Sequence, residues 1–308
     1  MSAQDPTSDV PPGRTVDPME PSRIEVLDGR HATVGEFGVE RVLPRRELRT
    51  VGAWCFADLM GPGEVTTEHG LDIGPHPHIG LQTVTWLIDG EVLHRDSLGS
   101  EQIIRPGQLN LMTAGRGVSH SEEATGRYAG PLHGVQLWVA QPDATRHGEP
   151  AFEHHAELPR VEIGSAEATI LVGVFNGAAS PARRDTDHVG IDLSLRSGRT
   201  TVPLDPSFEH ALIPTIGTLI VDDRPIRPGQ LGYLGVGRDE LDIEVDGPAR
   251  LLLIGGALFE HQPVMWWNYV ARNRKEIVAA HESWLADDGR FGHTSSPLDR
   301  VVIDSPPW

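Results

Sequence analysis

The hexapeptide IRPGQL occurs twice, at residues 104–109 and again at residues 226–231, 122 residues further along the chain. Its Pro-Gly pair favours a tight turn, and both copies lead into apolar, strand-like sequence. Further short apolar alternations between turn residues occur at residues 41–44, 81–88, 134–139 and 168–174. The pattern predicts an all-β protein that contains two β-barrels in tandem.

The length and composition agree with this architecture. A chain of 308 residues is long for one ordinary domain, and its 34 glycines and 25 prolines suit many turns between short strands. The first 23 residues are rich in proline and poor in large apolar groups, which predicts a disordered tail. The predicted boundaries are a tail at 1–23, an N-terminal barrel at 24–155, a C-terminal barrel at 156–262 and a C-terminal segment at 263–308.

The C-terminal segment differs from the rest of the chain in residue composition and in the spacing of its apolar residues. Helical spacing links Ile277, His281, Trp284 and Leu285. This spacing, in a stretch rich in alanine, glutamate and arginine, predicts one short helix that ends near residues 288–289 and packs on the barrels. The aromatic cluster at residues 266–269 is expected to serve packing rather than to contact a ligand.

Charge and cysteine usage exclude several classes of protein. The formal net charge is −18, from 44 acidic and 26 basic residues, so the chain should repel nucleic acid and anionic membranes. No apolar run approaches the roughly 20 residues of a membrane-spanning helix. Cys55 is the one cysteine, so no intramolecular disulfide can form. We expect a cytoplasmic protein, and a monomer.

Two pairs of metal-ligand residue types have the same spacing. His76 and His78 form one pair, and His120 and Glu122 form the other. Side chains at i and i+2 of a strand share a face, so two facing strands could bring three imidazoles and one carboxylate together. The alternative is two partly exposed loop histidines and an unrelated polar strand face. We predict a metal site.

Three neutral imidazoles and one carboxylate suit a borderline first-row ion, with two positions left open if the coordination is octahedral. Fe(II) is the leading candidate. Nickel, manganese, copper and zinc remain alternatives, because geometry and availability decide which ion occupies such a site.

The repeat supplies an internal comparison. The offset of 122 residues carries His120 and Glu122 to Asp242 and Glu244, and no histidine pair precedes these at the matching distance. The apolar residues that alternate with these acids should face the core, so both acids should face water. The second barrel is therefore expected to hold no metal.

The chain resembles the pirin family of two-barrel cupins over roughly residues 24–292. The resemblance is carried by PHPHIG at 75–80, MTAGRGVSHSE at 112–122 and LHGVQLW at 132–138. It implies jelly-roll barrels, a non-haem iron held by His76, His78, His120 and Glu122, and a metal-free C-terminal barrel. Pirins include quercetin 2,3-dioxygenases, which use O₂ to open a flavonol ring.

One position departs from the family pattern. Gln82 stands where pirins and cupins usually have glutamate. On uninterrupted strand parity Gln82 would share a face with His78, so we predict a catalytic role in which its amide bonds a substrate oxygen. Glu122 could instead serve as the carboxylate base. His94 and His133 are expected to be structural, although His94, Asp96 or Gln136 could bond the ligands from outside.

The sequence thus predicts a dioxygenase that binds a flavonol and O₂ through His76, His78, His120 and Glu122. The alternative is an iron-dependent redox sensor that binds a transcription factor or a metabolic enzyme, because oxidation of the metal would change the charge of the site. A zinc-containing or metal-free cupin of the isomerase or storage type is a third hypothesis.

Overall fold

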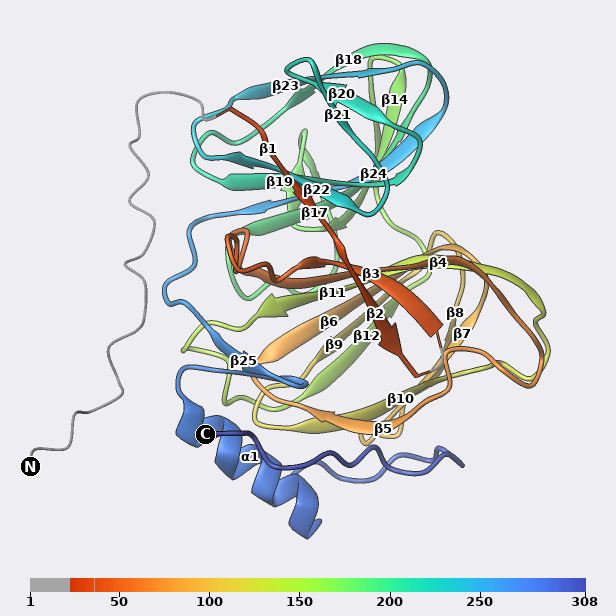
Figure 1. Ribbon diagram of the computed structural model, residues 1–308, viewed down its shortest axis with the longest axis vertical. Coiled ribbons are helices and arrows are strands. Elements are labelled where there is room, and N and C mark those ends of the chain that lie inside the picture. Colours follow the sequence, from red (N-terminus) through yellow and green to blue (C-terminus); the bar gives the residue numbers. More distant parts are fainter. Residues whose placement is uncertain (1–22, 36) are drawn as a thin grey trace, which may run out of the picture.

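The computed structural model describes residues 23–35 and 37–308, so the predicted disordered tail lies almost wholly outside the described part. Two β-barrels are stacked one on the other, and a helix lies below the lower, N-terminal barrel (Figure 1). The predicted all-β fold with two tandem barrels and a short C-terminal helix is confirmed.

The N-terminal barrel is built from a seven-stranded and a four-stranded antiparallel sheet. The larger sheet has the order β12-β9-β6-β11-β4-β3-β2, and its strands are β2 (Arg30–Val34), β3 (Phe37–Leu43), β4 (Trp54–Val65), β6 (Leu81–Asp89), β9 (Leu109–Thr113), β11 (Gly130–Ala140) and β12 (Ala151–His155). The smaller sheet has the order β5-β10-β7-β8, and its strands are β5 (Ile73–His78), β7 (Val92–Asp96), β8 (Glu101–Ile104) and β10 (Val118–Glu123).

The C-terminal barrel repeats this plan. Its larger sheet has the order β1-β22-β19-β24-β17-β14-β13, with β1 (Glu25–Asp28), β13 (Arg160–Ile163), β14 (Ala166–Val172), β17 (His188–Leu195), β19 (Glu209–Ile216), β22 (Gln230–Gly235) and β24 (Ala249–Gly256). The smaller sheet has the order β18-β23-β20-β21, with β18 (Gly198–Pro203), β20 (Leu219–Val221), β21 (Arg224–Ile226) and β23 (Glu240–Val245). A two-stranded hairpin is formed by β15 (Val174–Phe175) and β16 (Ala178–Ala179).

One strand of the predicted N-terminal barrel belongs to the other barrel. We predicted that the N-terminal barrel begins at residue 24, but β1 pairs with β22 in the sheet of the C-terminal barrel. The exchange ties the start of the described chain to the second half of the molecule. We retain the other boundaries as a proposal.

The repeated hexapeptide forms the same turn in both barrels. Gly107 and Gly229 have φ angles of 82° and 84°, which suit glycine at the third position of a type II turn with proline before it. The Gln108 amide donates to the Arg105 carbonyl at 3.1 Å, and the equivalent bond in the second copy is 3.0 Å. Each turn carries the chain from the smaller sheet into the larger one.

The two large sheets pack face to face through a shared apolar core. Strand alternation places Val84, Trp86 and Leu137 on this shared face, together with residues of the C-terminal barrel such as Leu252. The other face of the N-terminal sheet looks into its own barrel. The position of a residue along β6 or β11 therefore decides whether it joins the shared core or the barrel interior.

The C-terminal segment begins with a hairpin of β25 (Val264–Trp266) and β26 (Tyr269–Ala271), followed by α1 (Arg274–Ala286). Asn273 caps the helix by accepting a hydrogen bond from the Glu276 amide. The predicted stripe is buried except for Leu285, which is 43% exposed. In the described part of the chain no helix has the length and apolar character needed to cross a membrane.

The chain after α1 returns along β5. The Val301 amide donates to the Pro75 carbonyl at 2.9 Å, and the Trp284 indole donates to the Val301 carbonyl at 2.9 Å. A side chain on Gly74 would meet the carbonyl oxygen of Asp299 at 2.1 Å. Close approach of the C-terminal tail to β5 therefore requires glycine at position 74.

Gly74→Ala is expected to lower the free energy of unfolding by about 1–3 kcal/mol, the usual cost of overpacking, because the tail must move off β5. Chemical denaturation measures this difference. Gly247→Ala is the matched control, since no heavy atom lies within 4 Å of the Cβ that it would add. Equal stability of the two variants would contradict the prediction.

Candidate metal centre

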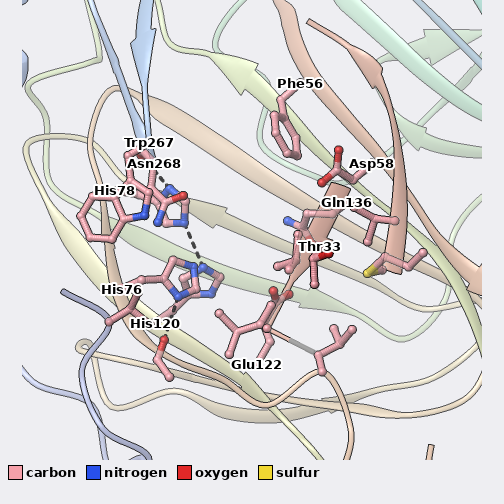
Figure 2. A pocket seen from close by; sticks show the side chains of 18 of the residues that line it. Thr33, Phe56, Asp58, His76, His78, His120, Glu122, Gln136, Trp267 and Asn268 are labelled. Carbon is pink, nitrogen blue, oxygen red and sulfur yellow. Dashed lines mark hydrogen bonds between the residues drawn. The ribbon is translucent and has the colours of Figure 1, made fainter. Parts of the chain in front are cut away.

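Strands β5 and β10 bring three predicted ligands together. His120 is the cross-strand partner of His76, and the Nε2 atoms of His78 and His120 are 3.1 Å apart. One ligand atom from each of the three histidines lies within 4.8 Å of the others. All three side chains are buried. This excludes the alternative of exposed loop histidines, and Figure 2 shows the three rings grouped at one side of a cavity.

The outer nitrogens of two of these rings are held by backbone carbonyls. His76 Nδ1 is 2.9 Å from the Gly74 carbonyl oxygen, and His78 Nδ1 is 2.9 Å from the Asn268 carbonyl oxygen. A carbonyl can only accept, so each Nδ1 donates its proton and each neutral ring keeps an unprotonated Nε2. The inward nitrogens are thus in the form that binds a metal ion, and the donor set fits one.

Burial also favours the metal-binding form of these rings. It lowers the pKa of His76 to about 4 and holds the pKa values of His78 and His120 well below the ordinary range, with neighbouring imidazoles adding to the effect. A buried imidazolium would be poorly solvated, so all three rings are neutral at physiological pH. Three neutral imidazoles can accept a cation without first losing a proton.

Glu122 lies in the same cavity but apart from the histidine cluster. Its carboxylate is not among the ligand atoms that lie within 4.8 Å of one another, although the side chain is buried and lines the cavity. In Figure 2 it lies between the imidazoles and Asp58. Burial raises its pKa to about 7. Its predicted role as fourth ligand stays a prediction, and its geometry also suits a proton acceptor.

The cavity has aromatic walls and a polar end. Its volume is about 490 Å³, within the range of small-molecule sites. Phe56 and Trp138 stack with ring centroids 4.0 Å apart. At the end away from the histidines, Arg41 binds Asp58 through two hydrogen bonds of 2.8 and 2.7 Å. Burial raises the pKa of Asp58 despite the opposing effect of this guanidinium.

Gln82 is not brought to the cavity, which corrects the predicted catalytic role. Its cross-strand partners are Val139 and Thr113, on the face that joins the shared core, and its amide donates to the Thr113 hydroxyl at 3.0 Å. The prediction assumed one uninterrupted strand from His78. Instead β5 ends at His78, and Gly80, with φ of 66°, turns the chain into the larger sheet.

Two functional candidates come from the C-terminal hairpin. Trp267 and Asn268 form its turn, line the cavity and lie beside His78 in Figure 2. Trp267 has a φ angle of 50°, an uncommon conformation for a bulky residue. The aromatic cluster was expected to serve packing, and Trp267 does contact the rings of Tyr269 and His281, but it also lines the cavity. In the sequence, the only sign of a turn at Trp267 is that an asparagine follows it and that short apolar runs flank the pair.

The remaining predictions concern residues around the site. Asp242 and Glu244 are exposed on β23, as predicted, while Leu241 and Ile243 between and beside them are buried. His133 is buried but does not line the cavity. His94 is not in the group of clustered histidines, and its Nδ1 lies 3.3 Å from His120 Nδ1.

Comparison with known proteins agrees with the fold and the site. The pirin family model matches residues 36–139, and the model of the pirin C-terminal cupin domain matches residues 190–292. A Pseudomonas aeruginosa protein named "putative quercetin 2,3-dioxygenase" is 44% identical over 92% of this chain and 90% of its own length. A pirin-like protein of Caulobacter vibrioides is 35% identical over 85% of this chain and 92% of its own length. The fold and site define a two-barrel cupin with a histidine metal centre. The chain belongs to the pirin family.

Solved structures show the same similarity. A crystal structure of quercetin 2,3-dioxygenase from Acinetobacter baumannii superposes with a TM-score of 0.89 at 42% identity, covering 92% of this chain and 96% of that chain. A bacterial pirin of Escherichia coli, solved in complex with nickel(II), has a TM-score of 0.62 at 16% identity and covers 77% of this chain and 100% of its own. At that identity the likeness concerns the fold alone.

Proposed function

We propose that the protein is a metal-dependent dioxygenase that opens a flavonol such as quercetin with O₂. The observation that carries the proposal is the buried three-histidine cluster at one side of a 490 Å³ cavity with aromatic walls. The names of the relatives at 44% and 42% identity support the same substrate class. A redox sensor needs the metal but not this cavity, so the cavity favours an enzyme.

Four side chains would hold the metal in this proposal: His76, His78, His120 and Glu122. Fe(II) is the ion we favour, with nickel, manganese, copper or zinc as the alternatives to test. When bound, the ion would supply Lewis acidity toward an enolate oxygen and would bring the two reactants together. The unprotonated Nε2 atoms and the buried carboxylate fit a divalent cation.

The residues of the chain also bind and orient the substrate. Phe56, Trp138 and Trp267 present aromatic surfaces to a planar ring system. Asp58 and Gln136 at the polar end suit the hydroxyl groups of a distal ring. Glu122 accepts the proton of the flavonol hydroxyl beside the histidines, a role that its pKa of about 7 suits. The apolar walls exclude water from the reacting ring.

We also propose three features that the sequence predicts. These are the boundary between the barrels near residue 155, a cytoplasmic location and a monomeric state. Size-exclusion chromatography with light scattering measures the last of these directly.

The test of the activity is anaerobic purification followed by loading with one metal at a time. We expect the iron-loaded protein to bleach the absorption band of quercetin when O₂ is admitted and to release carbon monoxide. Metal-free protein is the control. If no flavonol reacts with any of the five metals while each metal is bound, the proposed activity is wrong.

A further inference from the structure

A chain of hydrogen bonds leads from β7 to the metal cluster. His120 Nδ1 lies 3.3 Å from His94 Nδ1, and His94 Nε2 lies 3.1 Å from Asp96 Oδ2. Asp96 and His94 stand opposite His120 and Glu122 in the register of β7 and β10, so all four side chains face the barrel interior. His94 and Asp96 are 4% and 1% exposed. The contacts therefore lie out of reach of bulk water.

The Asp96 end of the chain is fixed by the backbone. Asp96 Oδ1 accepts the amides of Leu98 and Ser100, both at 2.9 Å, which leaves Oδ2 to face His94. Hydrogen bonds from two amides favour the ionised carboxylate, and an ionised carboxylate can only accept. His94 Nε2 must therefore be the donor in this contact.

This assignment determines the tautomer of His120. When the His94 ring carries this single proton on Nε2, its Nδ1 is unprotonated and can only accept. His120 Nδ1 then donates to it, and His120 Nε2 is left unprotonated. Its lone pair faces that of His78 Nε2 at 3.1 Å, an arrangement that a bound cation would stabilise. The same state follows for His76 and His78 from backbone carbonyls. His120 alone among these three rings depends on side chains for it.

We propose that His94 and Asp96 are positioning residues that set the tautomer and orientation of His120 for metal binding. The inference deepens the proposed function and rests on its metal site. Phe152 stacks on the His94 ring with centroids 4.4 Å apart and an interplanar angle of 13°, which holds the ring in the plane that both hydrogen bonds need. Neither residue is among those that line the cavity.

Asp96→Asn tests the inference with almost no change in shape. The Asn Oδ1 atom keeps the Leu98 and Ser100 amides, so the new NH₂ group takes the place of Oδ2 and donates to His94 Nε2. The His94 proton then moves to Nδ1, and the His120 proton must move to Nε2, where it occupies the lone pair that the metal needs. A residue with a purely structural role would not reverse this tautomer.

Two measurements follow the change. Ring ¹⁵N chemical shifts of metal-free protein report which nitrogen of His120 carries the proton, and transfer of Zn(II) to a chelator reports the dissociation rate. We expect the wild type to be protonated at Nδ1, Asp96→Asn to be protonated at Nε2, and Zn(II) to leave that variant about 10–100-fold faster. His94→Phe keeps the stack on Phe152 but loses the acceptor, so it should also lose Zn(II) faster.

His94→Gln is the rescue variant, because its amide oxygen can accept from His120 and its NH₂ group can donate to Asp96. His133→Phe is the matched control, a buried histidine of the same barrel outside the cavity, and should release Zn(II) like the wild type. If His120 keeps its proton on Nδ1 in Asp96→Asn, the inference is wrong. If the tautomer switches but wild-type protein binds no metal, the proposed function fails, while Asp96 is still shown to set the tautomer of His120.

Discussion

Replacing His78 by alanine is expected to abolish tight metal binding and all metal-dependent turnover. The substitution removes one of three imidazole nitrogens that lie within 4.8 Å of one another, and His78 Nε2 is 3.1 Å from His120 Nε2. Loss of a direct ligand should exceed the roughly 10–100-fold loss that follows removal of an outer partner. Elemental analysis after gel filtration measures the metal content of the variant.

Thermal unfolding supplies a second readout for His78→Ala. A ligand at 100 times its dissociation constant stabilises the native state by about 2.7 kcal/mol, so metal should raise the melting temperature of the wild type and not of the variant. His133→Ala is the control, since it removes a buried histidine that does not line the cavity. A metal-dependent rise in the His78→Ala melting temperature would show that this ring is not a ligand.

Local patterns predicted most of the fold. The turn at residues 104–109 depends on a proline and a glycine at fixed positions, so its second copy at 226–231 predicted a second barrel. The exchange of β1 could not be predicted in the same way. Its partner β22 lies about two hundred residues away, and a four-residue strand carries no local signal that selects one sheet edge over another.

The site shows the same division between local and distant information. Alternation along β5 and β10 predicted that His76, His78 and His120 would share one space. It failed for Gln82 because the chain turns at Gly80 between two strands, so the alternation of side chains along β5 does not continue into β6. Asn268 was missed because its contact with His78 joins residues 190 positions apart. Such contacts arise from packing of the C-terminal segment, which periodicity does not report.

The structure also separates two functions that the sequence assigned together to Glu122. The histidines converge as a cluster without its carboxylate, while the same side chain lines the cavity where substrate would lie. A carboxylate with a pKa near 7 is a better base than an ordinary glutamate. Ligation and proton transfer can be distinguished by a substitution that keeps an oxygen but loses the base.

Glu122→Gln is expected to keep the metal on the three clustered histidines, from which this carboxylate lies apart. It should lower kcat for quercetin by about 10²–10⁴-fold, the usual contribution of general base catalysis. The amide keeps the size of the side chain and one oxygen, but it cannot accept the proton of the flavonol hydroxyl. Stopped-flow absorbance of the iron-loaded variant, with metal content measured in the same sample, provides both quantities.

Glu123→Gln is the matched control for this prediction. Glu123 is the next residue of β10 and bonds Ser121 and Arg95 instead of lining the cavity. Its replacement should leave kcat near the wild-type value even if stability falls, because alternation along the strand points it away from the substrate. Unchanged turnover by Glu122→Gln would show that Glu122 is not the general base. Loss of metal with that substitution would identify the carboxylate as an essential ligand.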